Sequence, residues 1–509
     1  MKKMVFALGA ALVGSAVWAG ASPKAVAQAT PTEFRAFYNS ATRCLSPDLK
    51  AKVDGQAVDV RACRVSAMPY NRVWPGHQRP IDQTELASYL LVETEGKTAF
   101  EIERTKPFEK AVIRPRSRGV ALEKDGNTVR FEIVRPGAYT VEFDGEHGCL
   151  HLFVEPKRDF AEKGEPTLMF GPGVHFVGQV ELADHARVYL HRDAVVYGTF
   201  SAIGRRDVKV YGYGVVDGGM AERIFEHCYK PFQRNCFHAF DSKDIELDGP
   251  VLLDSSNWVC ALFNCEDAVI HDLKIVGQWR YNTDGIDLVN CRRVRVADSF
   301  VRSFDDTLVV KGIGEYADKP VEDILFERCV AWCGWGRTLE IGLETHAPHY
   351  RNVVYRDCDV IHASGPALDL QIGGEAVMDG VCFENIRVER GPIRHEVLDN
   401  GDGKSYAERA KGSEWSNPCV LFVDNYHNTW VGGHPDPKAF GSVKKVVFRD
   451  VAVTLEEGAQ KPPVHFKSHD KPFGEILVEN FTIDGVRQSA DDLVHAGSNP
   501  AGTAALQVR

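Results

Sequence analysis

Short runs in which apolar and polar residues alternate recur along most of the chain. Between residues 208 and 483 these runs usually return after about 26 to 37 residues, and nine copies can be laid over one another. The copies begin at Val208, Ile245, Ala268, Val294, Ile324, Val353, Val381, Val446 and Ile476. A period of two predicts strands, and a repeat of this length is typical of the coils of a solenoid. We therefore expect an all-β protein with a parallel β-helix over residues 167–485.

Many of the copies carry a polar residue between two pairs of apolar positions. These residues are Asp272, Asp298, Arg328, Asp357, Asn385, Asp450 and Asn480. Asp and Asn bond locally to the backbone and tolerate the left-handed conformation of a sharp bend. We expect each of these positions to separate two strands of one coil.

Residues 32–158 do not show this repeat. They hold shorter alternating runs, such as Ser88–Val92 and Tyr139–Phe143, which are separated by Gly and Pro turns. This pattern predicts a smaller N-terminal β-sandwich domain before the β-helix. A charged segment near residues 157–166 marks the boundary, and a polar insertion over residues 391–440 is expected to be a loop beside the solenoid.

The two ends of the chain have their own composition. Residues 1–27 combine two lysines, an apolar run from Met4 to Trp18 and the small residues Ala25-Val26-Ala27, which is the pattern of a secretory signal peptide. The apolar run is short for a membrane span, although a retained N-terminal anchor is the alternative. We expect an exported, periplasmic or extracellular protein that is not held in a membrane after signal cleavage. Residues 486–509 are expected to form a C-terminal tail without a fixed structure.

The charge balance excludes some partners. The formal net charge is −11, and removal of residues 1–27, which hold three lysines and no acid, makes it three units more negative. An acidic protein is unsuited to nucleic acid or anionic membranes. The charge also favours a neutral substrate over a polyanion. The sequence leaves the oligomeric state open.

Cysteine usage gives a second constraint. The chain has 13 cysteines, an odd number, so at least one thiol stays free unless it pairs between chains. Two pairs are candidates for disulfides, Cys44 with Cys63 and Cys228 with Cys236. Two further pairs occupy equivalent positions of the repeat, Cys265 with Cys291 and Cys329 with Cys358, and we expect them to be buried structural thiols. No cysteine pair has metal-ligand spacing, so neither a metal nor another cofactor is expected.

The candidate chemistry lies in the stretch from Gln278 to Gly312. Asp284 falls in one copy of the repeat, and Asp305 and Asp306 fall in the next. Adjacent strands of a β-sheet lie roughly 4.8 Å apart, so we expect these three carboxylates to meet on one outer face. Clustered carboxylates on a rigid sheet are suited to acid/base cleavage of a glycosidic bond.

The segment Asn282-Thr283-Asp284-Gly285, followed by Asp305-Asp306, resembles the glycoside hydrolase clan of the polygalacturonases (family 28) and of the dextranases and isopullulanases (family 49). The resemblance implies a right-handed β-helix and hydrolysis with inversion. It also implies that Asp305 is the general acid and that Asp284 and Asp306 hold and deprotonate a water molecule. The N-terminal region is similar to the accessory domain that precedes the β-helix in dextranase-like enzymes.

The sequence departs from the polygalacturonase pattern on the next two copies. Where those enzymes have Gly-His-Gly, this chain has Arg337 in place of the histidine. Where they have Arg-Ile-Lys, this chain has Asp369 and Gln371. Loss of the cations that would hold a uronate carboxylate favours a neutral sugar and the dextranase-like side of the clan, although the full family 49 pattern is absent.

Several other residues are candidates for substrate binding. They are Asn282, Lys311, Glu340, Glu344, Trp279 and Trp335, together with Arg337, Asp369 and Gln371. Lys311 either binds a sugar hydroxyl, restrains Asp306 or is an ordinary surface lysine. Trp279, Trp332 and Trp335 are expected beside the cleft, where aromatic faces suit the apolar faces of sugars.

We therefore predict an exported inverting glycoside hydrolase that acts on a neutral poly- or oligosaccharide. A polygalacturonase-like pectin hydrolase is the first alternative. A polysaccharide lyase, which would need a base and usually Ca²⁺, is the second. A glycan-binding β-helix protein without catalysis is the third.

Overall fold

The computed structural model describes residues 24–25, 45–66, 84–223, 231, 233–392, 417–427, 439–493 and 497–509. Most of the predicted signal peptide, Cys44, Cys228 and much of the predicted insertion lie outside these ranges. None of the helices in the described part of the chain has the length and the apolar character needed to cross a bilayer.

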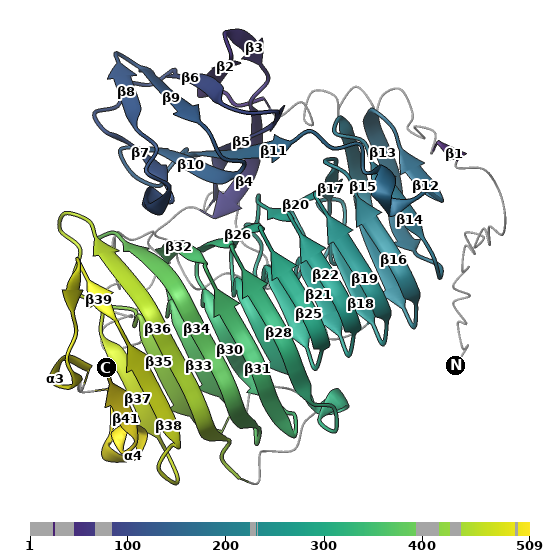
Figure 1. Cartoon of the computed structure of the whole chain (residues 1–509). Coiled ribbons are helices and arrows are strands. Elements are labelled where there is room, and N and C mark those ends of the chain that lie inside the picture. Colours follow the sequence, from purple (N-terminus) through teal and green to yellow (C-terminus); the bar gives the residue numbers. More distant parts are fainter. Residues whose placement is uncertain are drawn as a thin grey trace, which may run out of the picture.

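One sheet of 31 strands winds through the C-terminal two thirds of the chain as a right-handed parallel β-helix, so the predicted fold class is confirmed (Figure 1). Each coil presents three faces in turn, which we name A, B and C. Face A consists of β15 (Ala194–Ile203), β18 (Phe237–Phe240), β21 (Cys260–Phe263), β24 (Ile286–Val289), β27 (Leu308–Gly312), β30 (Leu339–Thr345), β33 (Leu368–Ile372), β35 (Leu421–Asn425) and β37 (Val464–Ser468).

Face B consists of β14 (Arg187–Leu190), β16 (Arg206–Tyr211), β19 (Lys243–Asp248), β22 (Glu266–His271), β25 (Arg292–Ala297), β28 (Val321–Glu327), β31 (His349–Arg356), the first halves of β34 (Val377–Arg390) and β36 (Ser442–Leu455), and β38 (Glu475–Glu479). Face C consists of β17 (Val215–Asp217), β20 (Val251–Leu253), β23 (Lys274–Ile275), β26 (Phe300–Ser303), β29 (Val330–Cys333), β32 (Asp359–Ala363), the second halves of β34 and β36, and β39 (Thr482–Ile483). At the N-terminal end β1 (Lys24–Ala25), β12 (Leu168–Phe170) and β13 (Gly173–Glu181) begin the sheet.

The repeat read from the sequence is the interior of this solenoid. The apolar residue that begins each of the nine copies lies in one continuous buried core. The seven bend residues all adopt left-handed backbone, with φ between 51° and 57°. The predicted core and the left-handed bends are confirmed, although β34 and β36 continue through the bends at Asn385 and Asp450. The stacked thiols Cys265, Cys291, Cys329 and Cys358 are part of the same core.

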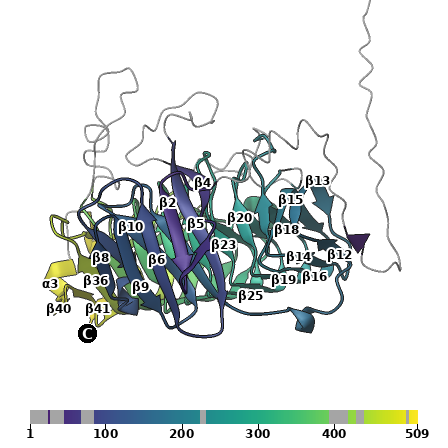
Figure 2. The same cartoon turned by 90° about the horizontal axis from the view of Figure 1, so that it is seen from above.

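The N-terminal domain is a sandwich of two five-stranded sheets. One sheet has the order β4 (Arg61–Ser66), β5 (Thr84–Thr94), β11 (Leu150–Pro156), β10 (Gly137–Phe143) and β7 (Ala111–Arg114). The other has the order β3 (Gln56–Val58), β2 (Leu49–Val53), β6 (Thr98–Arg104), β9 (Thr128–Ile133) and β8 (Leu122–Asp125). Alternating residues of both sheets form a buried core between them. Figure 2 shows the sandwich lying over the middle of the solenoid.

The sandwich packs against face C. A second apolar core joins Val65, Tyr89 and Phe153 of the sandwich to Phe300 and Trp332 of the solenoid, among others. Trp332, which we expected beside the cleft, is 2% exposed and belongs to this contact. That prediction was wrong, because the sandwich covers this part of face C and buries the Trp332 ring.

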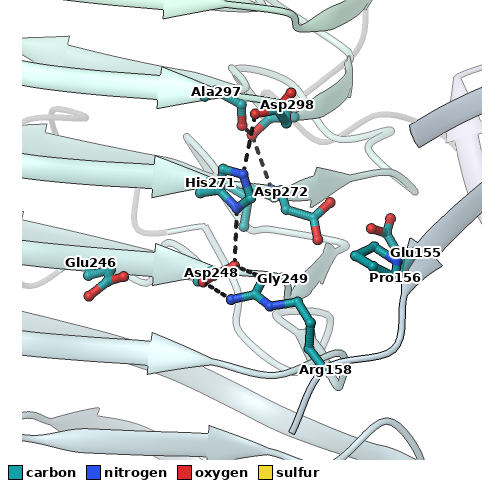
Figure 3. A network of polar contacts seen from close by, with 12 residues as sticks. Glu155, Pro156, Arg158, Glu246, Asp248, Gly249, His271, Asp272, Ala297 and Asp298 are labelled. Carbon is teal, nitrogen blue, oxygen red and sulfur yellow. Dashed lines mark hydrogen bonds and ion pairs between the residues drawn. The ribbon is translucent and has the colours of Figure 1, made fainter. Parts of the chain in front are cut away.

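The connection between the domains is held by charges (Figure 3). Arg158 donates to both carboxylate oxygens of Asp248, at 2.9 and 2.7 Å. His271 lies between Asp248 and Asp298 on the outside of face B, with its two ring nitrogens each 3.3 Å from a carboxylate oxygen. These two carboxylates raise the pKa of His271 to about 9. The linker is thereby tied to three successive coils.

The expected unstructured tail is wrong for much of residues 486–509. This segment forms β40 (Val486–Arg487), α3 (Ala490–Leu493), α4 (Pro500–Thr503) and β41 (Leu506–Val508), and β41 pairs in parallel with β38. Leu506 and Val508 pack against the solenoid core, and Leu493 is buried in it. The tail closes the open end of the solenoid, as terminal segments of such proteins do. The repeat could not predict the structure of this segment, because the segment occurs once and is not itself a copy of the repeat.

Each of the two predicted disulfide pairs has one cysteine in the described part of the chain, Cys63 and Cys236. Cys236 is a buried thiol that donates to the carbonyl oxygen of Leu253. Its predicted partner Cys228, and Cys44 of the other pair, lie outside the described residues.

Candidate active site

The three aspartates lie where chain segments leaving face C enter face A. The segment before β24 carries Asp284, and the segment before β27 carries Asp305 and Asp306. These segments lie side by side, since the Gly285 N–H donates to the Asp306 carbonyl at 2.8 Å and the Phe304 N–H donates to the Thr283 carbonyl at 3.2 Å. The prediction that the carboxylates meet across one coil is confirmed by this pairing.

Two glycines permit the close stacking of these segments. A Cβ on Gly285 would collide with the carbonyl oxygen of Thr307, and a Cβ on Gly336 would collide with the backbone of Asp305 and Asp306. Gly285 is the last residue of the Asn-Thr-Asp-Gly segment. The motif therefore needs glycine at this position, because the next coil approaches too closely for a Cβ atom.

Lys311 holds the cluster together from below. Its Nζ lies 3.1 Å from Asp306 Oδ2, 3.4 Å from Glu344 Oε2 and 3.9 Å from Asp284 Oδ2. The side chain is buried, and its Nζ also lies 5.4 Å from the centre of the Trp258 ring. Of the alternatives for Lys311, the structure shows restraint of Asp306 and excludes a surface lysine. The surrounding carboxylates keep the pKa of Lys311 well above its usual value despite burial.

The neighbouring aspartates differ in their affinity for a proton. Burial, followed by the charge of Asp306, raises the pKa of Asp305 to about 7. Burial also opposes the charge on Asp306, but Lys311 and Arg337 outweigh it, so the pKa of Asp306 lies below its usual value. The pKa of Asp284 is raised well above the usual value by burial and by Asp287, Asp305 and Asp306. One of two adjacent carboxyls therefore keeps a proton near neutral pH while the other is ionised.

Asp287 is a member of the cluster that the sequence analysis missed. It is fully buried on β24, and within the described part of the chain neither of its carboxylate oxygens has a hydrogen-bond partner. Burial and the nearby acids raise its pKa well above the usual value, although Lys311 opposes the shift. The signal was available in the sequence, because Asp287 stands between the inward residues Ile286 and Leu288 and so had to point outward with the other aspartates.

The next two coils extend the polar surface of face A. Glu340 of β30 lies in register with Asp369 of β33, while Leu368 and Leu370 point into the core, so the outward orientation assumed for Asp369 and Gln371 is confirmed. Arg337 Nε lies 3.6 Å from Asp369 Oδ2 and 4.0 Å from Glu340 Oε1.

Hydrogen bonds tie these coils to the aspartates and to the far side of the face. The Arg337 backbone N–H donates to Asp306 Oδ1 at 2.9 Å. Gln371 Nε2 donates to Asp369 Oδ1 at 3.2 Å, and the Tyr426 hydroxyl donates to Gln371 Oε1 at 3.2 Å. Asp369 is fully buried and Gln371 nearly so, which means that they shape the floor of this part of the face.

The residues that solvent reaches form the rim of the cluster. Asn282, Asp305, Trp335, Arg337 and Glu344 are partly exposed. The Trp335 ring packs on Phe304, with 5.4 Å between ring centres. Trp279, by contrast, is 8% exposed and donates its indole N–H to Asp254 Oδ1 at 2.7 Å. The expectation that Trp279 presents a face to the sugar was wrong, because the ring is part of the wall.

The described residues contain no group of three or more His, Cys, Asp or Glu side chains arranged to hold a metal ion. A hollow of about 1500 Å³ between the sandwich and the solenoid is lined by Arg118, Tyr139, Arg328 and others. It shares no lining residue with the aspartate cluster.

Comparisons with known proteins find similarity over the part of the chain that carries this cluster. Residues 171–390, which include every residue of the cluster, match the family model of Glycosyl hydrolases family 28. The chain is 23% identical over 363 residues to a probable polygalacturonase of Vitis vinifera, covering 64% of this chain and 68% of the relative. It is 22% identical over 265 residues to a probable rhamnogalacturonase A of Aspergillus oryzae, covering 52% of this chain and 48% of that relative. The chain thus spans about half the length of the second relative.

Among solved structures, the fold is similar to that of Dex49A from Penicillium minioluteum. The TM-score is 0.62 at 13% sequence identity, and the similarity covers 91% of this chain and 94% of that one. The likeness therefore includes the sandwich as well as the solenoid. The match to the family 28 model covers less than half of the chain, and the likeness to Dex49A is a likeness of fold, a right-handed β-helix preceded by a sandwich.

Proposed function

We propose that the protein is an exported inverting glycoside hydrolase in which Asp305 is the general acid and Asp306, with Asp284, activates the attacking water. The observation that carries this proposal is the split between Asp305 and Asp306, adjacent residues whose pKa values are pushed in opposite directions. Such pairs mark the acid and the base of a catalytic site. The signal-like segment at the N-terminus supports export.

The acid step needs a proton at the rim of the site. Asp305 is partly exposed and holds its proton up to about pH 7. The proton passes from its carboxyl group to the glycosidic oxygen as the bond from that oxygen to the anomeric carbon breaks, and the bonding pair stays on the oxygen. Asp305 is left as a carboxylate.

The water step needs a carboxylate that is ionised at the same pH. Asp306 meets this requirement, because Lys311 and Arg337 stabilise its charge. Asp284 lies beside it on the same lysine and is suited to orienting the water. The water adds to the anomeric carbon from the face opposite the leaving group and loses its proton to Asp306, which inverts the configuration.

The charges of the site favour a neutral glycan. The cluster contains seven carboxyl groups, Asp284, Asp287, Asp305, Asp306, Glu340, Glu344 and Asp369, and two cations, Lys311 and Arg337. Both cations lie within 4.0 Å of these carboxylates. A uronate carboxylate would find both cations already paired with carboxyl groups, whereas neutral hydroxyls can bond to carboxyl groups in either protonation state.

Hydrolysis of a pectic backbone is the second candidate. The family 28 match and the relatives described as a polygalacturonase and a rhamnogalacturonase favour it. It requires a uronate to be bound without cations at positions 369 and 371, for which Arg337 on the rim is the available group.

The test is a panel of dextran, pullulan, polygalacturonate and rhamnogalacturonan, with reducing ends measured for the wild-type protein and for Asp305→Asn. We expect a neutral glycan to be cleaved fastest, and Asp305→Asn to lose at least about 10²-fold in rate while keeping its melting temperature. Product anomers followed by NMR in the first minutes should be inverted. Preference for a pectic substrate would transfer the proposal to the second candidate, and retained configuration would reject the water-activating role.

Two further measurements separate the remaining alternatives. A lyase would release unsaturated products that absorb in the ultraviolet and would respond to added Ca²⁺. A glycan-binding protein without catalysis would release no reducing ends and would bind as well after loss of all three aspartates.

A further inference from the structure

Arg223, which follows β17, reaches the catalytic segment from another coil. Its Nη1 donates to the Tyr281 carbonyl oxygen at 2.5 Å, and its Nη2 donates to Asn282 Oδ1 at 2.8 Å. The guanidinium carbon lies 5.1 Å from the centre of the Tyr281 ring. Two of these contacts are with Tyr281, and the third is with Asn282, the residue that precedes the Thr283-Asp284 pair.

These contacts determine which end of the Asn282 carboxamide faces the acid. A guanidinium group can only donate hydrogen bonds, so it must meet the oxygen of the carboxamide. The amino group is then directed to the other side, where Nδ2 lies 3.5 Å from Asp305 Oδ2. Asn282 adopts left-handed backbone, with φ of 56°, which holds the side chain between the two partners. Rotation of the carboxamide by half a turn would place its amino group against the guanidinium, which sets donor against donor.

The length of the contact with Asp305 has a chemical meaning. At 3.5 Å the N–H of Asn282 is at the outer limit of a hydrogen bond while Asp305 keeps its proton. When that proton leaves for the glycosidic oxygen, negative charge appears on the Asp305 carboxylate. A donor already aimed at this oxygen then forms a shorter, charge-assisted bond, so its contribution is larger in the transition state than in the ground state.

We propose that Arg223 is a positioning residue for the hydrolysis, which acts by orienting the Asn282 carboxamide so that its N–H stabilises the Asp305 carboxylate formed on proton transfer. This inference rests on the proposed role of Asp305 as the general acid. It assigns to Arg223 an effect on turnover rather than on substrate binding, since the hydrogen bond to Asn282 leads to the acid.

The experiment is a double-mutant cycle of Arg223→Met and Asn282→Ala, assayed on the panel glycan that the wild-type protein cleaves fastest. Each single variant should lower kcat by about tenfold or more, the usual effect of losing a hydrogen bond to a charged group, with KM nearly unchanged. The double variant should be no slower than Asn282→Ala. The basic limb of the pH profile of kcat/KM should move to higher pH in each, because the Asp305 carboxylate has lost a donor.

Two controls make the cycle specific. Arg223→Lys keeps a donor and should recover part of the lost rate in the wild-type background but none in the Asn282→Ala background. Arg295→Met removes a partly exposed arginine of face B that pairs with Glu327 at 2.7 Å, and its kcat should remain within roughly twofold of the wild type, as expected for an independent surface site. If Arg223→Met does not fold, the lysine variant in the two backgrounds carries the same comparison.

Additive losses in the double variant, or an unmoved pH profile in folded Arg223→Met, would overturn the positioning role. Normal turnover of Asp305→Asn would instead overturn the proposed acid. An inactive Asp305→Asn together with a fully active Arg223→Met would leave the proposed function in place and reject only the role of Arg223.

Discussion

At the scale of single residues, the site depends on one buried lysine among acids. Lys311 reaches carboxylates that come from three successive coils, and it is itself 3% exposed. A buried cation in such a place is stabilised by its partners, and removal of either side leaves unpaired charge. Lys311 is thus the group that allows Asp306 to be ionised next to Asp305.

Replacement of Lys311 should therefore change the chemistry before it changes the fold. In Lys311→Met the pKa of Asp306 should rise, so the acidic limb of the pH profile moves up and the rate falls by at least about 10²-fold, the effect of losing the base. Lys319→Met is the matched control, because that lysine is partly exposed and its ammonium group lies 2.9 Å from the carboxylate of the adjacent Asp318. A profile of Lys311→Met that matches the wild type would show that Asp306 is ionised by other means.

The wild-type protein should also lose activity as pH rises through about 7. The pKa of Asp305 is raised to about 7, and the acid must hold its proton to act, so kcat/KM should fall with a single ionisation in this range. The measurement is kcat/KM between pH 5 and pH 9, a range that spans the group on both sides. Constant activity up to pH 9 would remove Asp305 from the role of acid.

At the scale of elements, the solenoid owes its regularity to its bends. Asn385 has φ of 52° and donates to Asp357 Oδ1 of the preceding coil at 2.5 Å. Left-handed backbone is costly for residues other than Gly, Asn and Asp, so bends of this kind restrict the sequence at one position in each coil.

Substitution of Asn385 separates the two contributions. Asn385→Gly loses the hydrogen bond to Asp357 but adopts the left-handed backbone without strain. Asn385→Val loses the same hydrogen bond and is also strained, because a β-branched side chain disfavours left-handed φ. Val should lower the free energy of unfolding by about 1–2 kcal/mol more than Gly does. Urea unfolding followed by circular dichroism measures the difference. Equal midpoints for Gly and Val would mean that the bend does not constrain this position.

The same scale explains what the sequence could reveal. Alternation and spacing were sufficient to predict the coils, their bends, and the proximity of Asp284 to Asp305 and Asp306, because all of these follow from the repeat. Alternation also pointed to Asp287, which the analysis overlooked. It could not reveal the burial of Lys311, since that follows from acids of three coils converging on one atom. Arg223 lies in a segment without periodicity, and nothing in its neighbours indicates a partner 59 residues away.

Aromatic residues gave the poorest predictions for a related reason. Trp279 and Trp332 were expected at the cleft, but one bonds to Asp254 in the wall and the other contacts the sandwich. The exposure of a large side chain on a rung depends on which segment covers that rung. This information is in the docking of the domains and not in the repeat.

At the scale of the whole molecule, charges along face B link the linker to the solenoid and respond to pH. The pKa of His271 is raised to about 9 by Asp248 and Asp298, above the value of about 6.5 for a free imidazole. Protonated His271 therefore stabilises the fold in full below about pH 6.5, and this contribution is lost as pH rises through about 9.

The unfolding free energy of the wild-type protein should consequently fall between pH 6.5 and pH 9 by more than that of His271→Asn. Asp298→Asn, which removes one of the two partners in Figure 3, should show an intermediate slope. Denaturant unfolding at a series of pH values measures these slopes. Parallel curves for the wild type and His271→Asn would show that the histidine does not couple the linker to protonation.

The apolar core shared by the sandwich and face C bears on how such proteins change over evolutionary time. Val65, Tyr89 and Phe153 contribute to it from one domain, and Phe300 and Trp332 from the other. A solenoid separated from its sandwich would leave a strip of large apolar side chains in water, and strips of this kind promote association between molecules. The two parts therefore cannot be exchanged as independent modules, and a new sandwich could be recruited only together with compensating changes along face C.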